Sequence, residues 1–252
     1  MAIALRKPAE IDKLRKAGQV VGQTLQYLQQ NVHAGMTLKE IDAMGEAYLR
    51  DLGAEPSFKG LYGFPAAVCT SLNEVIIHGV PTDTVVQEGD ILGIDIGSKL
   101  DGYYGDAAIT MPIGTISEED EALIQCSKDA LFMAIEAIKP GMRFKELTKR
   151  LEDFITERGY VPLRDFAGHG IGTQPHDEPS IPNYLEGTPK QGPKIKNGMV
   201  FCLEPMICQK EDQPYIWEED GWSVESIDGL RTAHYEHQIA VVGGRAVILT
   251  EP

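Results

Sequence analysis

The chain has 252 residues, of which 42% are hydrophobic, which suffices for one large domain or two small ones with a sizeable core. Its formal net charge of −15 argues against a nucleic-acid groove, because phosphate binding needs a basic face. No apolar run could span a membrane, and the N-terminus MAIALRKPAE has neither a long apolar stretch nor a cleavage site, so we expect a cytoplasmic protein. The four cysteines follow no Cys-x-x-Cys spacing and are expected to be reduced and buried: Cys69, Cys126, Cys202 and Cys208.

Two amphipathic stretches open the chain and predict two helices. Pro8 can begin the first helix, because proline suits the first helical turn. The inward face of this helix comprises Ile11, Leu14, Val21, Leu25 and Leu28. The second helix follows Thr37, which can form a capping box with Glu40, and it ends at Gly53. Its apolar stripe comprises Leu38, Ile41, Tyr48, Leu49 and Leu52.

The segment ILGIDIGSKLDGYYGDAAIT has the pattern of a β-hairpin that turns at Asp101-Gly102. With a two-residue loop, Asp95 faces Ala108 and is a diagonal neighbour of Asp106. With a four-residue loop, Asp95 faces Asp106 directly. Both registers place the two aspartates on one face of the hairpin. Because the residues around them are largely apolar, the hairpin is predicted to be buried.

The second part of the chain repeats the organisation of the first. AGMTLKEI begins at Ala34 and PGMRFKEL begins at Pro140, and their aligned glycines, Gly35 and Gly141, lie 106 residues apart. Each string opens an amphipathic stretch, and a further helix precedes each stretch. Ser117 can cap the helix that precedes the second copy. Internal repetition of this kind predicts two related structural units.

Strands repeat as well as helices. EGDILGID and NGMVFCLE are apolar runs that each close on an acid, at Asp95 and Glu204. No Gly/Ser-rich linker separates the copies. We therefore predict an α+β fold with two pseudo-symmetric helix-helix-strand halves around a central antiparallel sheet. The halves span about 8–115 and 117–250 of a single domain, 1–252.

Four acids in these apolar strands predict a metal site. Asp95, Asp106, Glu204 and Glu236 all lie in strand-like segments, and no cationic side chain is placed between them, since Lys99 falls at the turn. An uncompensated buried charge costs about 3–5 kcal/mol. A solvated edge hairpin is the alternative, but the strands are too apolar for it. If one histidine imidazole joins the four carboxylates, the site has five ligands. Such an oxygen-rich site suits Mn, Fe(II) or Co, and can accept Zn. Two bridging carboxylates favour a two-metal centre.

From about Ile11 to Val247, the chain resembles the type I methionine aminopeptidases. The matching strings are SLNEVIIHGVP, DGYYGD, AGHGIG, PHDEPSIPNY, MVFCLEPM and YEHQIAVV. The resemblance implies the pita-bread fold. It also implies two divalent metal ions, of Co, Mn, Fe or Zn. The implied ligands, in chain order, are Asp95, Asp106, His169, Glu204 and Glu236.

The resemblance further implies roles around the metals. Asp95 would bind one ion, Asp106 and Glu236 would bridge both, and His169 and Glu204 would bind the other. Glu204 would also carry a proton to the leaving amine. His78 would contact the scissile amide and His176 the substrate carbonyl, with Asp177 and Glu178 behind it. Phe64, Cys69 and Trp222 would form the methionine pocket. Departures from the family pattern near this pocket are Leu61, Phe58 and Pro175.

The implied function is removal of the initiator methionine from nascent polypeptides when the second residue is small. We expect a monomer that contacts neither membranes nor specific nucleic-acid sequences. The basic loop GTPKQGPKIKNG makes transient ribosome contact a further hypothesis. A sister hydrolase acting on X-Pro bonds or creatine is one alternative, although such relatives carry a large domain for which there is no room before Pro8. A peptide-binding module without activity is the other, but all five ligands are present.

Overall fold

The structure is a computed structural model that describes residues 3–251. Within this range the helices are α1 (Pro8–Asn31), α2 (Leu38–Asp51), α3 (Glu118–Ala137) and α4 (Phe144–Thr156), with one 3-10 turn, η1 (Leu61–Gly63). The strands of the first half are β1 (Glu55–Pro56), β2 (Val68–Leu72), β3 (Val75–Ile77), β4 (Ile91–Leu100) and β5 (Tyr103–Pro112). Those of the second half are β6 (Val161–Pro162), β7 (Ala167–Gly170), β8 (Asp177–Pro182), β9 (Val200–Leu203), β10 (Met206–Cys208), β11 (Pro214–Ile216), β12 (Val224–Ser226), β13 (Ala233–His234), β14 (Glu236–Val242) and β15 (Arg245–Ile248).

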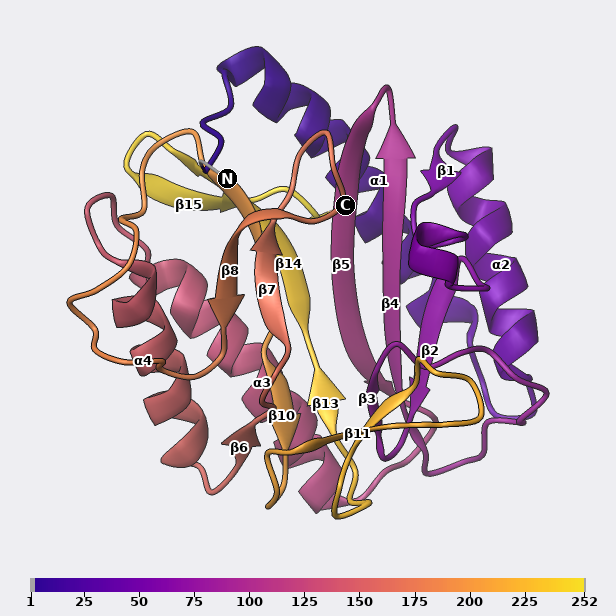
Figure 1. The fold of residues 1–252 in the computed structure, drawn as a ribbon. Coiled ribbons are helices and arrows are strands. Elements are labelled where there is room, and N and C mark those ends of the chain that lie inside the picture. The colour runs from indigo at the N-terminus through magenta and orange to yellow at the C-terminus, as the bar shows by residue number, and fades with distance from the viewer. Residues whose placement is uncertain (1–2, 252) are drawn as a thin grey trace.

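A curled antiparallel sheet dominates the molecule. Its strand order is β1-β4-β5-β14-β9-β7-β8, with β2 paired to β4 and β15 paired to β14. Helices α1 and α2 lie behind one half of the sheet and α3 and α4 behind the other, so that one face of the sheet is free of helices (Figure 1). Two large apolar clusters fill the space between helices and sheet, one in each half. No helix within residues 3–251 is long and apolar enough to cross a membrane.

The predicted repeat is visible in the backbone. Gly35 and Gly141 have φ values of +97° and +93°, and Gly53 and Gly159 both have φ of +83°. Residues with side chains rarely adopt these left-handed conformations. The same turns therefore recur at the same places in both halves, before and after the second helix of each.

The predicted helix caps are confirmed in both halves. Ser117 Oγ accepts a hydrogen bond from a backbone N–H at the start of α3 at 3.1 Å. Thr37 Oγ1 accepts a hydrogen bond from the backbone N–H of Glu40 at 3.2 Å, and Glu40 Oε2 accepts one from the N–H of Thr37 at 2.7 Å. The equivalent position before α4 is Arg143, whose guanidinium has no acceptor atom. Arg143 instead donates to the carbonyl oxygen of Gly192, in the loop before β9.

The β4–β5 hairpin has the two-residue loop, so the four-residue alternative is wrong. Asp101 and Gly102 have φ values of +50° and +79°, as in a type I′ turn. Asp95 is therefore paired with Ala108, and Asp106 is a diagonal neighbour two residues away along β5. Asp95 does not close its strand, because the ladder continues five residues further to the turn. Glu204 does follow the last residue of β9.

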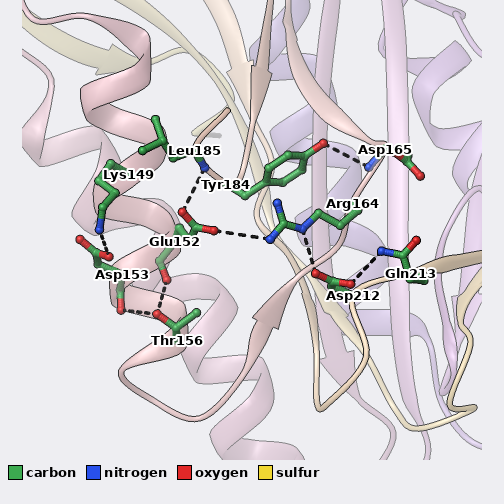
Figure 2. A network of polar contacts seen from close by, with 10 residues as sticks. All are labelled: Lys149, Glu152, Asp153, Thr156, Arg164, Asp165, Tyr184, Leu185, Asp212 and Gln213. Carbon is green, nitrogen blue, oxygen red and sulfur yellow. Dashed lines mark hydrogen bonds and ion pairs between the residues drawn. The ribbon is translucent and has the colours of Figure 1, made fainter. Parts of the chain in front are cut away.

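A polar network fixes the connections beside β7 (Figure 2). Arg164 donates from Nε to Asp212 Oδ2 at 2.8 Å, lies 3.6 Å from Glu152 of α4, and stacks over the ring of Tyr184. Glu152 also accepts a hydrogen bond from the backbone N–H of Leu185. The network joins α4, the β6–β7 connection, the segment after β8 and the β10–β11 loop. It therefore restrains the segment that leads into β7.

Candidate metal centre

Strand register brings the predicted acids together on the helix-free face. Asp95 of β4 pairs with Ala108 of β5, and Glu236 of β14 pairs with the same alanine from the other side. The next residue, His237, pairs with Leu203, which places Glu236 beside Glu204. Paired residues point to the same face of a sheet, so three strands and the end of β9 direct carboxylates into one volume. Sequence reasoning anticipated this meeting, although the pairing of β14 with both β5 and β9 is new.

The carboxylates need a cation. Asp106 and Glu236 are only 4% and 2% exposed, and Asp106 Oδ1, Glu236 Oε1 and Asp95 Oδ1 have no hydrogen-bond partner. Burial raises the pKa of Asp95 to about 7. Burial and then repulsion between the carboxylates raise the pKa values of Asp106, Glu204 and Glu236 well above their ordinary range. Within residues 3–251, no lysine or arginine forms an ion pair with these acids. Unpaired acceptor oxygens in this number fit divalent cations.

His169 presents a lone pair to the same volume. Its Nδ1 lies 3.0 Å from the carbonyl oxygen of Gly170, which can only accept, so Nδ1 carries the proton. Nε2 lies 3.8 Å from Asp106 Oδ2 and 3.7 Å from Glu204 Oε1. Burial lowers the pKa of His169 to about 3, so the imidazole is neutral at physiological pH. A neutral imidazole with a free Nε2 is suited to bind a metal.

Two glycines let His169 approach from the strand. A Cβ atom at Gly168 would lie 2.5 Å from the carbonyl oxygen of Cys202, and one at Gly170 would lie 2.0 Å from that of Glu178. Real side chains would push β7 away from its neighbours β9 and β8. The glycines in AGHGIG therefore permit the close packing that carries the imidazole to the acids.

Cys202 lies closer to this centre than its sequence suggested. One potential ligand atom from each of Asp106, His169, Cys202 and Glu236 lies within 4.8 Å of the others. All four cysteines are free and buried, as predicted. Burial, and then the charges of Glu236 and Asp106, raise the pKa of the Cys202 thiol, which stays protonated. The donor set is therefore mainly oxygen with one imidazole nitrogen. The spacing of Cys202 to Glu204, two residues along one strand, could have revealed this position.

A cavity of about 430 Å³ opens beside the acids. Its apolar wall includes Phe64 and Cys69, which are 5% and 3% exposed, and Trp222, whose ring meets that of Phe64 edge-on at 5.3 Å. Asp95, Asp106, His169, Glu204 and Glu236 line the other end. Phe58 and Leu61, two of the departures from the family pattern, also line it, whereas Pro175 is buried outside its lining.

His78 and His176 also line the cavity. His78 has φ of +56°, and its ring lies 5.7 Å from that of Phe166. Burial lowers the pKa of His78 to about 4 and also lowers that of His176. The His176 ring lies 4.5 Å from that of His169. Asp177 was expected behind His176, but its carboxylate instead pairs with Arg6 Nη2 at 3.1 Å.

Tyr62 at the cavity mouth was not anticipated. Its side chain is 75% exposed, and its ring stacks on His176 at 5.9 Å with an interplanar angle of 15°. The backbone of Tyr62 is left-handed, with φ of +49°, between two glycines that also have positive φ. The closely spaced Gly60 and Gly63 indicated a turn, but the contact with His176 joins segments more than one hundred residues apart. Phe166 was also missed, because its ring contacts that of His78 from a distant part of the chain.

Known proteins are similar to this chain in sequence and in fold. The model of metallopeptidase family M24 matches residues 12–242, and the chain therefore belongs to that family. It is 59% identical over 253 residues to a methionine aminopeptidase of Helicobacter pylori, with complete coverage of both chains, and 41% identical to that of Clostridium perfringens, with 98% coverage of each. A methionine aminopeptidase from Thermotoga maritima has a TM-score of 0.96 at 35% identity, with complete coverage of both chains. The prolidase from Pyrococcus furiosus has a TM-score of 0.80 at 25% identity, and the match covers 65% of it. The predicted family and pita-bread fold are confirmed.

Proposed function

We propose that this protein is a methionyl aminopeptidase, a metal-dependent enzyme that removes the N-terminal methionine of nascent polypeptides when the second residue is small. The observation that carries the proposal is the apolar cavity that ends at five potential metal ligands. The full-length similarity to methionine aminopeptidases supports this reaction over X-Pro hydrolysis, since the prolidase match leaves a third of that chain uncovered.

The five ligands would hold two divalent ions, chosen from Co, Mn, Fe and Zn. Asp95 would bind one ion and His169 and Glu204 the other, while Asp106 and Glu236 would bridge them. The unpaired oxygens of three of these carboxylates support the assignment. When bound, such ions act as Lewis acids and make water nucleophilic near neutral pH. The ligands come from both halves of the chain, which supports the proposal that residues 1–252 work as one catalytic domain.

The other side chains would orient the peptide and move protons. Phe64, Cys69 and Trp222 would surround the methionine side chain, and the acidic end would receive the free α-amine, which an internal peptide bond lacks. His78 would contact the scissile amide. His176 would donate a hydrogen bond to the carbonyl oxygen as negative charge develops there. Glu204 would carry the proton from the attacking water to the leaving amine.

Peptide turnover tests the proposal. Metal-free protein prepared with a chelator should be inactive, and Mn, Fe(II) or Co should restore cleavage of Met-Ala-Ser. Peptides that begin Met-Lys or Leu-Ala should be cleaved far more slowly, because the proposed enzyme would accept one thioether side chain in its pocket and only a small second residue. Full activity without metal, or faster cleavage of an X-Pro peptide than of Met-Ala-Ser, would reject the proposal.

A basic surface supports transient ribosome contact as a second proposal. The loop 187–198 carries Lys190, Lys194 and Lys196, and Arg143 and Lys145 at the start of α4 both donate hydrogen bonds to backbone carbonyls of the segment 186–192. These cations stand out in a chain of net charge −15, and ribosomal RNA is anionic.

Charge reversal tests this surface. Changing the three loop lysines to glutamate should reduce cosedimentation with ribosomes and leave Met-Ala-Ser turnover unchanged. Reversal of Lys13, Lys16 and Lys128, which are exposed on helices, makes the same change in net charge and is the control. Equal binding by the two triple variants would reject the contact.

We further propose that the protein is a cytoplasmic monomer, which cell fractionation and light scattering test.

A further inference from the structure

One buried imidazole at the metal centre has no role in the proposed reaction. His234 is 3% exposed, and its Nε2 has no hydrogen-bond partner. That nitrogen lies 3.7 Å from Oε2 of Glu204. A buried polar atom without a partner is costly, so its position next to a carboxylate calls for a physical reason.

The backbones on both sides of this contact are fixed. The N–H of His234 donates to Thr110 Oγ1 at 2.9 Å, and the same hydroxyl donates to the carbonyl oxygen of His234 at 2.9 Å. On the other side, Asn183 Nδ2 donates to the carbonyl oxygen of Glu204 at 2.9 Å, and Ser127 Oγ donates to that of Pro205 at 2.9 Å. Only side-chain rotation can therefore change the distance between the imidazole and the carboxylate.

The two oxygens of Glu204 face different imidazoles. Oε1 lies 3.7 Å from Nε2 of His169, the nitrogen with the free lone pair, and Oε2 faces His234. A carboxylate only accepts hydrogen bonds, so Nε2 of His234 either carries a proton or shares a cation with Oε2. The five proposed ligands already serve two ions without His234, which favours the protonated nitrogen.

We propose that His234 is a positioning residue that donates a hydrogen bond from Nε2 to Oε2 of Glu204 and so reserves Oε1 for the metal. A side-chain rotation that moves the atoms together by less than about 1 Å brings them into hydrogen-bond range. The inference rests on the proposed function of Glu204 as metal ligand and proton carrier. Without the donor, the carboxylate is free to turn both oxygens to the metal, which alters the metal site and removes the oxygen that carries the proton.

Two substitutions separate a donor from a packing residue. His234→Gln keeps an N–H group that can reach Glu204, and His234→Leu keeps a similar volume without a donor. His237→Leu is the matched control, because it removes a half-buried imidazole on the next strand that bonds Thr250 Oγ1 at 2.8 Å. Each variant is measured for Mn affinity of the metal-free protein by calorimetry and for the visible absorption spectrum after Co(II) loading. Its kcat and KM on Met-Ala-Ser and its thermal midpoint are also measured.

His234→Leu should lower kcat and metal affinity, each by about 10- to 100-fold, with KM changed far less, and should alter the Co(II) spectrum. His234→Gln should keep the wild-type spectrum and recover most of kcat. His237→Leu should lower the thermal midpoint only. A wild-type spectrum and kcat in His234→Leu would overturn the inference, and so would a His234→Gln variant as defective as His234→Leu. Glu204→Gln distinguishes a failure of the His234 proposal from a failure of the proposed function of Glu204. An active, metal-binding Glu204→Gln protein would reject the role of Glu204 itself.

Discussion

The carboxylate of Asp106 destabilises the fold when no metal is bound. It is 4% exposed, lacks a partner for Oδ1, and is repelled by Glu236 and Asp95, which together with burial raise its pKa. Asp120 is equally buried, at 7% exposure, but Arg231 Nη1 donates to it at 2.5 Å. One buried acid is thus left for an external cation, while the other is neutralised within the fold.

Asp106→Asn should therefore be the most damaging single change to activity. As a bridging ligand it would serve both ions, so we expect Mn affinity to fall by more than about 100-fold, beyond the effect of residues outside the ligand set, and kcat/KM to fall further than in His176→Ala. Calorimetry and Met-Ala-Ser kinetics measure this. Asp120→Asn is the control, and it should lower thermal stability without changing Mn affinity. Tight Mn binding by Asp106→Asn would contradict the assignment.

The two histidines of AGHGIGTQPHDEP should separate by experiment. His169→Ala removes the imidazole whose Nε2 faces Asp106 and Glu204, so metal affinity and activity should fall together. His176→Ala removes an exposed donor at the cavity wall, so metal affinity should stay near wild type while kcat falls roughly 100- to 1,000-fold. The opposite pattern in calorimetry and kinetics would show that the two roles are reversed.

At the residue scale, the sequence predicted the charged residues of the site. It missed the contacts between residues that lie far apart in the chain. Asp95 and Asp106 could be placed together because one short turn joins their strands. His234 and Glu204 could not, because their contact depends on Thr110 and Asn183 fixing two separate strand ends. Tyr62 and His176 likewise meet only after the whole sheet has formed.

At the scale of elements, the spacing of β7 from its neighbours sets the position of His169. Local signals predicted the capping box of α2, because Thr37 and Glu40 interact within one turn. The hairpin loop length stayed open in the sequence, because the same strand pattern is compatible with two turns. The start of α4 depends on a distant loop carbonyl, that of Pro193, which accepts a hydrogen bond from the N–H of Phe144 and which no local pattern contains.

Gly170→Ala tests the role of the strand spacing. Its Cβ would lie 2.0 Å from a backbone oxygen of β8, so β7 must shift and carry His169 away from the acids. We expect Mn affinity and kcat to fall together by at least about 10-fold, as is typical when a residue that orients a metal ligand is replaced. Gly221→Ala is the control, because nothing lies within 4 Å of its Cβ although φ is +70°. It should cost about 1 kcal/mol of unfolding free energy and leave Mn affinity unchanged. Equal Mn affinities in both variants would contradict the argument.

At the scale of the whole molecule, the two halves meet at a site that neither could build alone. The first half supplies Asp95 and Asp106, and the second supplies His169, Glu204 and Glu236. The repeated strings of the sequence predicted this two-part origin. What they could not predict is the order of strands, in which β14 is inserted between β5 and β9 and so brings Glu236 next to acids from both halves.

The buried acids should make the metal-free protein less stable as pH rises. Their pKa values are raised in the fold, to about 7 for Asp95 and well above the ordinary range for the other three, so the stability that protonation gives is lost as pH increases through the folded-state pKa values. The buried histidines act in the opposite direction, because their lowered pKa values remove stability as pH falls below about 6.5. Between about pH 6.5 and 8.5 the histidines add no slope, and the buried thiols, whose pKa values are also raised, act in the same direction as the acids.

In this pH range the unfolding free energy of metal-free protein should fall with pH, by about 1.4 kcal/mol per pH unit for each carboxyl that remains protonated. Added Mn should reverse the trend, because metal binds the ionised carboxylates and its affinity rises as they lose protons. Chemical unfolding at several pH values, with and without Mn, measures both slopes. Asp106→Asn should have a shallower metal-free slope than wild type, because one of the titrating groups is gone. A metal-free protein that becomes more stable toward pH 8.5 would show that the acids are already neutralised by groups within the chain.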